Sequence, residues 1–329
     1  MLPRVLITGA DGFIGSHLTE LMVRAGYPVR AFAQYQALGS LGWIDQLAPE
    51  IQKELEVIRG DIRDARQLEQ AVEGCEWVFH LAALISIPYS YLAPSSYLET
   101  NVNGTLNILE ACKRHGTDRI IVTSTSEVYG TAQYVPIDEQ HPLQPQSPYS
   151  ASKVSSDSFA TAYFRTFELP VTIARPFNAY GPRQSTRAII PTIITRLLAG
   201  NEILKLGDLT PTRDLNFVED TAAAFLAMAQ SPQTIGQALN IATGVETSMQ
   251  ELTEMLIELI LPSAQIELDR DRIRPSGSEV FRLLGNAQKL RDLTSWAPKF
   301  DLRDGLAKTI EWYRQPGHLA YFQQHGNFV

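Results

Sequence analysis

Two polar clusters in the middle of the chain have residue types and a spacing that suit acid–base chemistry. The first, residues 123–130, follows an apolar, β-branched run at 119–122, so its hydroxyls are expected at the carboxyl end of a buried strand, where ligands bind in open α/β sheets. The second begins with Ser147 and Pro148, an N-cap followed by a proline at the first helical position. Tyr149 and Lys153 therefore lie one turn apart on a predicted helix.

This spacing is chemically useful. A lysine ammonium one helical turn from a phenol favours the phenolate, and it draws the tyrosine pKa, ordinarily about 10, towards the range needed for general acid–base catalysis. The alternative is a tyrosine and a lysine on an ordinary helix surface. The pattern Tyr-x-x-x-Lys alone does not separate the two interpretations, but the amino terminus of the chain favours the functional one.

A glycine-rich turn near the amino terminus joins a predicted strand, residues 4–8, to a helical pattern that continues to Ala25. Gly9, Gly12 and Gly15 fall where the strand ends and the helix begins. Backbone N–H groups and the helix N-terminus can then contact a pyrophosphate. An ordinary strand-to-helix turn is the alternative, but the positions of the glycines favour a dinucleotide-binding turn.

Together with three further motifs, these features resemble the extended short-chain dehydrogenase/reductase family over essentially the whole chain. The motifs are Gly9-x-x-Gly12-x-x-Gly15, Asp61-Ile62, Leu81-Ala82-Ala83, Asn101-Val102-Asn103-Gly104-Thr105 and Tyr149-x-x-x-Lys153. Within that family, residues 125–130 resemble the nucleotide-sugar 4,6-dehydratases. Residues 83–91 are most similar to the GDP-N-acetylglucosamine 4,6-dehydratases of the legionaminic-acid route.

The resemblance implies a tightly bound, recycled NAD or NADP, a nucleotide-diphosphate-sugar substrate and no metal. The implied catalytic residues are Thr125, Ser126, Glu127, Tyr149 and Lys153. The implied cofactor-binding residues are Gly9, Gly12, Phe13, Ile14, Gly15, Asp61, Ile62, Leu81, Ala82, Ala83, Asn101, Thr123, Tyr149 and Lys153.

Substrate binding is expected from residues of the carboxyl-terminal half and from Ser86. Arginines at turns can clamp a diphosphate, because guanidinium pairs with phosphate bidentately, although each could instead be a solvated surface arginine. The resemblance favours Arg213 and Arg274 among them and adds Asn178. The expected set is Ser86, Asn178, Arg183, Arg187, Arg213 and Arg274.

The second predicted strand, residues 29–33, bears on the choice of cofactor. The family commonly carries an aspartate at its end, which binds the adenosine ribose, but here Ala33 is followed by Gln34 and Tyr35. Without that carboxylate a 2′-phosphate is not repelled, yet no arginine directly follows to bind one. The choice between NAD and NADP stays open, with NAD slightly favoured.

Strand and helix signals alternate along the chain, which predicts an α/β fold, a Rossmann-type doubly wound parallel sheet with a smaller C-terminal substrate lobe. The chain has 329 residues, enough to bury a large core. We expect a dinucleotide-binding domain at 1–178, to which the chain returns at about 212–245. The substrate lobe is expected at 179–329, mainly 179–211 and 246–329.

Composition limits the partners and the cellular compartment that we expect for the protein. A net charge of −8 argues against a nucleic-acid or anionic-membrane surface, and no apolar run reaches the roughly 20 residues of a membrane span. Cys75 and Cys112 lie in helical patterns and are expected to be free buried thiols, which fits the cytoplasm. His80 is expected to be a packed strand histidine.

Two predicted helices, residues 95–115 and the helix after Tyr149, are apolar on several faces. One interpretation is burial in the core of a single chain. The other, which the family favours, is a two-fold homodimer interface.

For the reaction, the resemblance implies C4 oxidation by Tyr149, removal of the C5 proton by Glu127, loss of water from C6 and return of the hydride to C6, with Thr125 orienting the 4-oxygen. Related dehydratases place aspartate where Ser126 stands, so the group that protonates the leaving hydroxyl stays open. UDP-glucuronate decarboxylase, nucleotide-sugar 4-epimerase and a non-catalytic dinucleotide sensor are the alternatives. An epimerase has no use for a carboxylate at Glu127, and a sensor has no need of the complete set.

Overall fold

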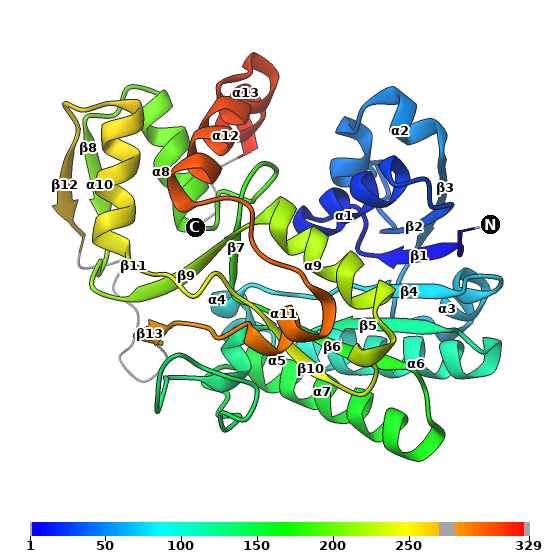
Figure 1. Cartoon of the computed structure of the whole chain (residues 1–329). Coiled ribbons are helices and arrows are strands. Elements are labelled where there is room, and N and C mark those ends of the chain that lie inside the picture. The colour runs from blue at the N-terminus through cyan, green and yellow to red at the C-terminus, as the bar shows by residue number, and fades with distance from the viewer. Residues whose placement is uncertain (1, 270–279, 326–329) are drawn as a thin grey trace.

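The computed structural model of the protein describes residues 2–269 and 280–325. Its main layer is a seven-stranded parallel sheet with the strand order β10-β6-β5-β4-β1-β2-β3 (Figure 1). The strands are β1 (Val5–Thr8), β2 (Val29–Gln34), β3 (Leu55–Gly60), β4 (Trp77–His80), β5 (Arg119–Thr123), β6 (Val171–Pro176) and β10 (Ala238–Ile241). The order runs in opposite directions from β1, which confirms the doubly wound sheet and puts the ligand crevice where β1 and β4 end.

Helices cover both faces of this sheet. One face carries α1 (Phe13–Arg24) and α9 (Val218–Gln230), and the other carries α3 (Ala65–Val72), α6 (Gly104–His115) and α7 (Pro148–Phe167). Successive residues of β1 serve opposite faces, because Val5 and Ile7 belong to the core under α1 while Leu6 belongs to the core under α6. A strand buried on both faces has a continuous apolar sequence, as β1 does.

The crossover elements are shorter. They are η1 (Gly42–Gln46), α2 (Pro49–Lys53), α4 (Ile87–Leu92), α5 (Pro94–Tyr97), η2 (Leu98–Asn103) and η3 (Ser126–Tyr129). The helix predicted at 95–115 is one helical run with a π-helical turn, η2, between α5 and α6. A π turn inserts an extra residue and re-aims the side chains around it, and here that turn contains Asn101.

The smaller lobe contains a four-stranded sheet and a two-stranded sheet. The first is built from β7 (Asn178–Tyr180), β9 (Thr212–Phe217), β11 (Glu246–Ser248) and β13 (Arg282–Leu283), the second from β8 (Ile203–Leu206) and β12 (Gln265–Leu268). Packed with these strands are α8 (Ile189–Leu198), α10 (Met249–Ile260), α12 (Leu302–Arg314) and α13 (Pro316–His325).

The chain does return to the main sheet, but later than residue 212. β9 lies in the small sheet, so the returning segment consists of α9, η4 (Pro232–Thr234) and β10, followed after the small sheet by α11 (Gln288–Thr294) against β10. The domain limits at 178 and 179 stay a prediction.

Two smaller expectations, on the cysteines and on His80, are confirmed. Cys75 and Cys112 are free and buried, and burial raises their thiol pKa values to about 11 and about 12. His80 is a packed strand histidine whose Nδ1 lies 2.8 Å from the Thr8 hydroxyl, and burial lowers its pKa to about 3. Among the described residues, no helix is long and apolar enough to cross a membrane, and no group of acidic, histidine or cysteine side chains could hold a metal ion.

Candidate active site

The glycine-rich turn is built so tightly that only glycine fits at Gly9 and Gly15. Gly9 has φ +71°, and a Cβ there would lie 2.7 Å from the backbone nitrogen of Ala82 after β4. A Cβ on Gly15 would lie 2.0 Å from the Gly9 carbonyl oxygen. The turn is thus pressed between the ends of β1 and β4.

The turn leaves the N-terminus of α1 available to an anion. Gly12 is the N-cap and is exposed, no side chain caps the helix, and its first turn contains no acidic residue. The first N–H groups of a helix lack partners within the helix and favour negative charge. These residues therefore fit the pyrophosphate of a dinucleotide, with Phe13 and Ile14 beginning the helix that would hold it.

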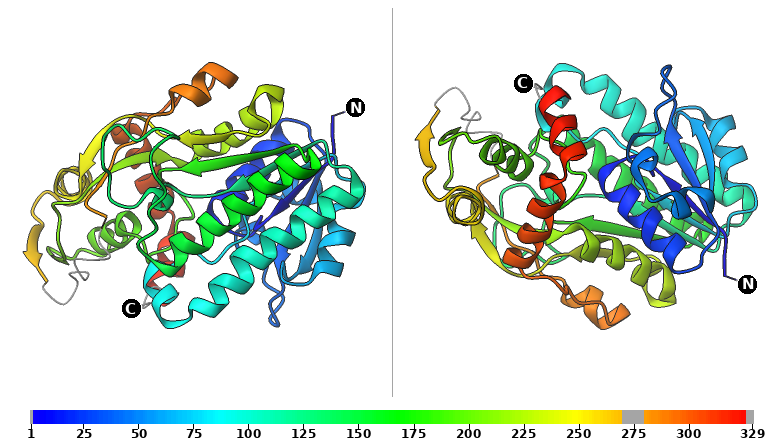
Figure 2. Two further views of the ribbon diagram at one scale, coloured as in Figure 1. Left: turned by 90° about the horizontal axis from the view of Figure 1, so that it is seen from below. Right: turned by 90° about the horizontal axis from the view of Figure 1, so that it is seen from above.

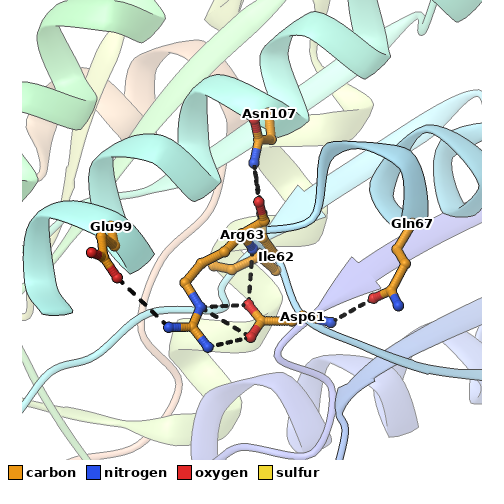
Figure 3. Close-up of polar contacts among 6 residues, drawn as sticks. All are labelled: Asp61, Ile62, Arg63, Gln67, Glu99 and Asn107. Carbon is orange, nitrogen blue, oxygen red and sulfur yellow. Dashed lines mark hydrogen bonds and ion pairs between the residues drawn. The ribbon is translucent and has the colours of Figure 1, made fainter.

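The expected adenine-side corner lies after β3 (Figure 3). The Asp61 carboxylate pairs with the Arg63 guanidinium at 2.5 Å, and this lowers the Asp61 pKa despite some burial. Asn107 on α6 donates to the carbonyl oxygens of Ile62 and Arg63, each at 3.1 Å. The polar groups at this corner are therefore partnered within the protein. The adenine contact of Asp61 stays a prediction.

Asn101 has a positioning contact that its expected role as a cofactor ligand did not include. Its side-chain oxygen accepts from the Leu84 N–H at 2.8 Å, and its amide donates to the Leu84 carbonyl at 2.9 Å and to Ser152 on α7 at 2.9 Å. The segment after β4, which contains Leu81, Ala82 and Ala83, is thereby fixed against the catalytic helix.

Tyr149, Thr125 and Glu127 come together at the end of β5. The predicted start of α7 is confirmed, because the Ser147 hydroxyl accepts from the Ser150 N–H at 3.1 Å and Pro148 occupies the first turn. Tyr149 is buried and hydrogen-bonded to the Thr125 side chain, and the Glu127 carboxylate is near enough to raise the Tyr149 pKa. The Thr125 hydroxyl also caps η3 by accepting from the Glu127 N–H at 3.2 Å.

The expected direction of the Tyr149 pKa is wrong for the protein chain on its own. Burial raises the Tyr149 pKa above its ordinary value, the hydrogen bond from Thr125 lowers it, and the charge of Glu127 raises it further. Lys153 is itself buried, and this lowers its own pKa to about 8. Burial therefore sets the direction of both pKa shifts, and for Tyr149 this direction is opposite to the one expected from its spacing to Lys153.

Behind Lys153 lies a buried ion pair that the sequence analysis missed. Asp157, one turn further along α7, accepts from the Arg175 guanidinium at 2.9 and 3.1 Å, and Lys153, Asp157 and Arg175 are each at most 5% exposed as whole residues. Asp157 raises the Lys153 pKa, opposing the effect of burial. Arg175 also donates to the Tyr129 hydroxyl at 3.0 Å, which in turn donates to Asn240 at 2.7 Å.

The expected substrate residues differ in their surroundings. The buried Asn178 side-chain oxygen has no hydrogen-bond partner among the described residues, and Arg187 is near enough to the Tyr97 hydroxyl to lower its pKa against the larger effect of burial. Tyr97 packs edge-on against Tyr149, with ring centroids 6.2 Å apart. These contacts bring Arg187 towards the catalytic cluster.

Three other expected substrate residues, Arg183, Arg213 and Ser86, have partners within the protein. Arg183 forms an ion pair with Glu20 on α1 at 2.6 Å, and the buried Arg213 donates to the Thr212 carbonyl at 2.9 Å. The Ser86 hydroxyl caps α4 by accepting from the Tyr89 N–H at 3.4 Å. Arg274 lies outside the described residues, and the roles of all four in substrate binding stay predictions.

Comparison with known proteins agrees with this geometry. Residues 6–309 match the family model described as GDP-mannose 4,6 dehydratase. The chain belongs to this family. The shared architecture is that of the short-chain dehydrogenases/reductases that act on nucleotide sugars.

Individual relatives of the family cover nearly the whole chain. A dTDP-glucose 4,6-dehydratase of Actinoplanes sp. is 34% identical over 94% of this chain and 98% of its own length. A UDP-glucose 4-epimerase of Mycolicibacterium smegmatis is 33% identical over 94% and 98%. The crystal structure of a double mutant of DesIV, a dTDP-glucose 4,6-dehydratase from Streptomyces venezuelae with NAD bound, has a TM-score of 0.85 at 32% identity, covering 95% of this chain and 97% of that one.

The role of Asp157 can be tested by the pH dependence of turnover. Asp157→Asn removes the charge that raises the Lys153 pKa, so that pKa falls below about 8. If turnover needs the ammonium, the alkaline limb of the kcat profile moves to lower pH by roughly one unit.

The control is Glu69→Gln, which removes a carboxylate from an exposed ion pair between α3 and α6, with Arg114 at 3.1 Å. A profile that is merely lowered at every pH, with its alkaline limb unmoved, would show that Asp157 acts only on folding.

Proposed function

We propose that this protein is a nucleotide-sugar 4,6-dehydratase that uses a tightly bound NAD or NADP. The observation that carries the proposal is the meeting of Thr125 and Glu127 with Tyr149 at the strand edge beside the glycine-rich turn. A base for a hydroxyl and a second base for a carbon acid are the two groups that the reaction requires. The relatives named dTDP-glucose 4,6-dehydratase support the same chemistry.

Each residue has a defined task in this proposal. Tyr149 takes the proton of the sugar 4-hydroxyl, and Thr125, already hydrogen-bonded to Tyr149, orients the 4-oxygen. The dinucleotide, when bound, supplies the reversible acceptance of a hydride and, when oxidised, a positive charge that favours the phenolate. Lys153 stabilises the phenolate from one turn away on α7.

Glu127 serves as the base for the elimination of water. A ketone at C4 acidifies the proton at C5, and the Glu127 carboxylate removes it. Water then leaves from C6, and the proton that Glu127 has gained goes to the departing hydroxyl. Ser126 is buried in η3 beside Glu127, where related dehydratases have an aspartate, so Glu127 serves as both base and acid.

The relatives named UDP-glucose 4-epimerase support a second candidate, because an epimerase also oxidises C4. A decarboxylase shares that first step and then loses a carboxylate from C5. Both need Tyr149 and Lys153, but neither needs a base for the C5 proton. Glu127 beside Tyr149 therefore favours the dehydratase over the epimerase.

For the substrate we propose GDP-N-acetylglucosamine. The support is the similarity of residues 83–91 to the dehydratases that act on it, together with a family model described by a GDP-sugar. In the structure this segment includes most of α4, whose Tyr89 packs against Tyr97 with ring centroids 6.2 Å apart, next to the catalytic cluster.

The order of the steps separates Glu127 from Tyr149. Glu127→Gln keeps the shape and removes the base, so the variant should oxidise C4 and stall, with product formation reduced by about 10² to 10⁴. The spectrum of reduced dinucleotide should appear after substrate is added, and deuterium exchange from solvent at C5 should be lost.

Tyr149→Phe is the matched variant, since it blocks the earlier step. It should show no reduced dinucleotide at all while still binding the cofactor. A Glu127→Gln protein that dehydrates substrate at the wild-type rate would contradict the assignment, as would a folded, substrate-bound one that never reduces its cofactor.

We also propose a homodimer formed through α6 and α7, which lie side by side across the molecule (Figure 2). Leu98, Phe159 and Phe167 are 57%, 38% and 49% exposed on this helical layer. Phe164 also lies on α7 but does not belong to this exposed surface. Its ring packs on Gly236 within the same chain, where a Cβ added to Gly236 would lie 2.3 Å from the ring. Charging Phe164 would therefore test folding and not assembly.

Phe159→Glu should convert a dimer into a monomer, because it places a charge in an apolar interface. Sedimentation at micromolar concentration is the measurement. Val245→Glu, at a valine that is 60% exposed near the small sheet, is the control and should remain dimeric. A wild-type protein that sediments as a monomer would contradict the proposal.

A further inference from the structure

The end of β2 lacks the side chain that its place in the fold calls for. In dinucleotide-binding domains of this type, a carboxylate after the second strand hydrogen-bonds the ribose of the cofactor. Here Ala33 is buried within the strand, and the two residues that follow, Gln34 and Tyr35, are exposed and uncharged.

A carboxylate reaches the same place from the glycine-rich turn. The Asp11 Oδ2 accepts a hydrogen bond from the Gln34 N–H at 3.2 Å, although the two residues are 23 positions apart. Since β2 is the neighbour of β1, the turn after β1 lies directly across the carboxyl end of β2. Asp11 therefore occupies the corner at which the ribose carboxylate is normally found.

The position of Asp11 is fixed by the η1 segment. The Trp43 N–H donates to the Asp11 carbonyl oxygen at 3.0 Å, and Gly42 has φ +56° with room for no Cβ, which would lie 2.6 Å from that oxygen. Trp43 is held in turn by the Trp312 ring of α12, with centroids 5.6 Å apart. Asp11 is thus held by contacts with the end of β2 and with η1, and η1 is in turn held by α12.

The Asp11 carboxylate has acceptor capacity to spare. It accepts from the Gln34 N–H and from its own backbone N–H, whereas an ionised carboxylate offers about four acceptor sites. Burial raises its pKa, and among the described residues it forms no ion pair. A neighbouring diol would supply the missing donors.

We propose that Asp11 is the ribose-binding carboxylate of this protein and that it selects NAD over NADP. The inference rests on the dinucleotide binding in the proposed function. Asp11 accepts hydrogen bonds from the ribose hydroxyls, and a phosphate on the 2′-oxygen would bring a second anion against it, which is unfavourable.

The opposing feature at this corner is Arg59. It pairs in register with Ala33, and its guanidinium donates to the carbonyl oxygen of Gly39 in the loop after β2, at 3.3 Å. An arginine can bind a 2′-phosphate, so Arg59 would favour NADP where Asp11 favours NAD. Asp11 is partly buried and fixed, while Arg59 is exposed and screened by solvent, so the charge of Asp11 dominates.

The test is the dinucleotide that the protein carries and its affinity, neither of which depends on turnover of a sugar. Nucleotides released from purified, denatured wild-type protein should be NAD and not NADP by mass. Asp11→Asn keeps an oxygen for the Gln34 N–H but loses the charge. In fluorescence titrations of nucleotide-free protein, Asp11→Asn should lower the ratio of the NADP to the NAD dissociation constant at least about tenfold, chiefly by tighter NADP binding.

The control is Asp45→Asn in η1, whose carboxylate accepts from the Leu41 N–H at 2.8 Å. It disturbs the same loop without changing the charge at β2 and should retain the wild-type preference. Wild-type protein that carries NADP would overturn the inference, as would a folded Asp11→Asn protein with unchanged preference. Either result leaves the dehydratase proposal intact, because that proposal depends on Glu127 and Tyr149.

Discussion

The buried charges behind the catalytic tyrosine are the feature on which the rest of the site depends. Lys153, Asp157 and Arg175 lie almost out of contact with solvent, and isolated charges in such a place would be strongly unfavourable. Asp157 binds Arg175 through two hydrogen bonds and raises the pKa of Lys153, so the two cations share one anion. This arrangement keeps an ammonium beside Tyr149 in a region that would otherwise favour the neutral amine.

The same buried pair connects the sheet to the catalytic helix. Arg175 lies on β6 and Asp157 on α7, while the link from Arg175 through Tyr129 to Asn240 reaches η3 and β10. The element that carries Glu127 is therefore tied to the helix that carries Tyr149 and Lys153. Loss of either Arg175 or Asp157 leaves the charge of the other buried without compensation. This is far more costly than loss of a surface ion pair.

Much of this architecture was predictable from local pattern. The parallel sheet follows from alternating apolar strands and helices, and the start of α7 follows from Ser147 and Pro148. Glycine spacing at Gly9, Gly12 and Gly15 predicted the turn whose contacts with Ala82 and with itself now show why glycine is required. These signals involve neighbours in the sequence, so they can be read without a structure.

The features that were missed depend on contacts between distant segments. Asp157 follows Lys153 at helical spacing, which was visible, but its partner Arg175 comes from another strand; an arginine inside the buried strand 171–176 was the signal that a carboxylate must face it. Asp11 meets Gln34 only because β1 and β2 are neighbours. The Tyr149 pKa was mispredicted because desolvation depends on burial, which spacing does not reveal.

In the proposed reaction, one site oxidises C4 and eliminates water across C5 and C6. The most direct measurement uses GDP-N-acetylglucosamine deuterated at C4, with the UDP and dTDP sugars alongside, and locates the label in the product by mass and NMR. We expect loss of water from the GDP sugar and transfer of the label to C6 of a 4-keto-6-deoxy product. A label that returns to C4 with no loss of mass would show an epimerase and contradict the proposed reaction, and loss of water from only a UDP or dTDP sugar would contradict the substrate.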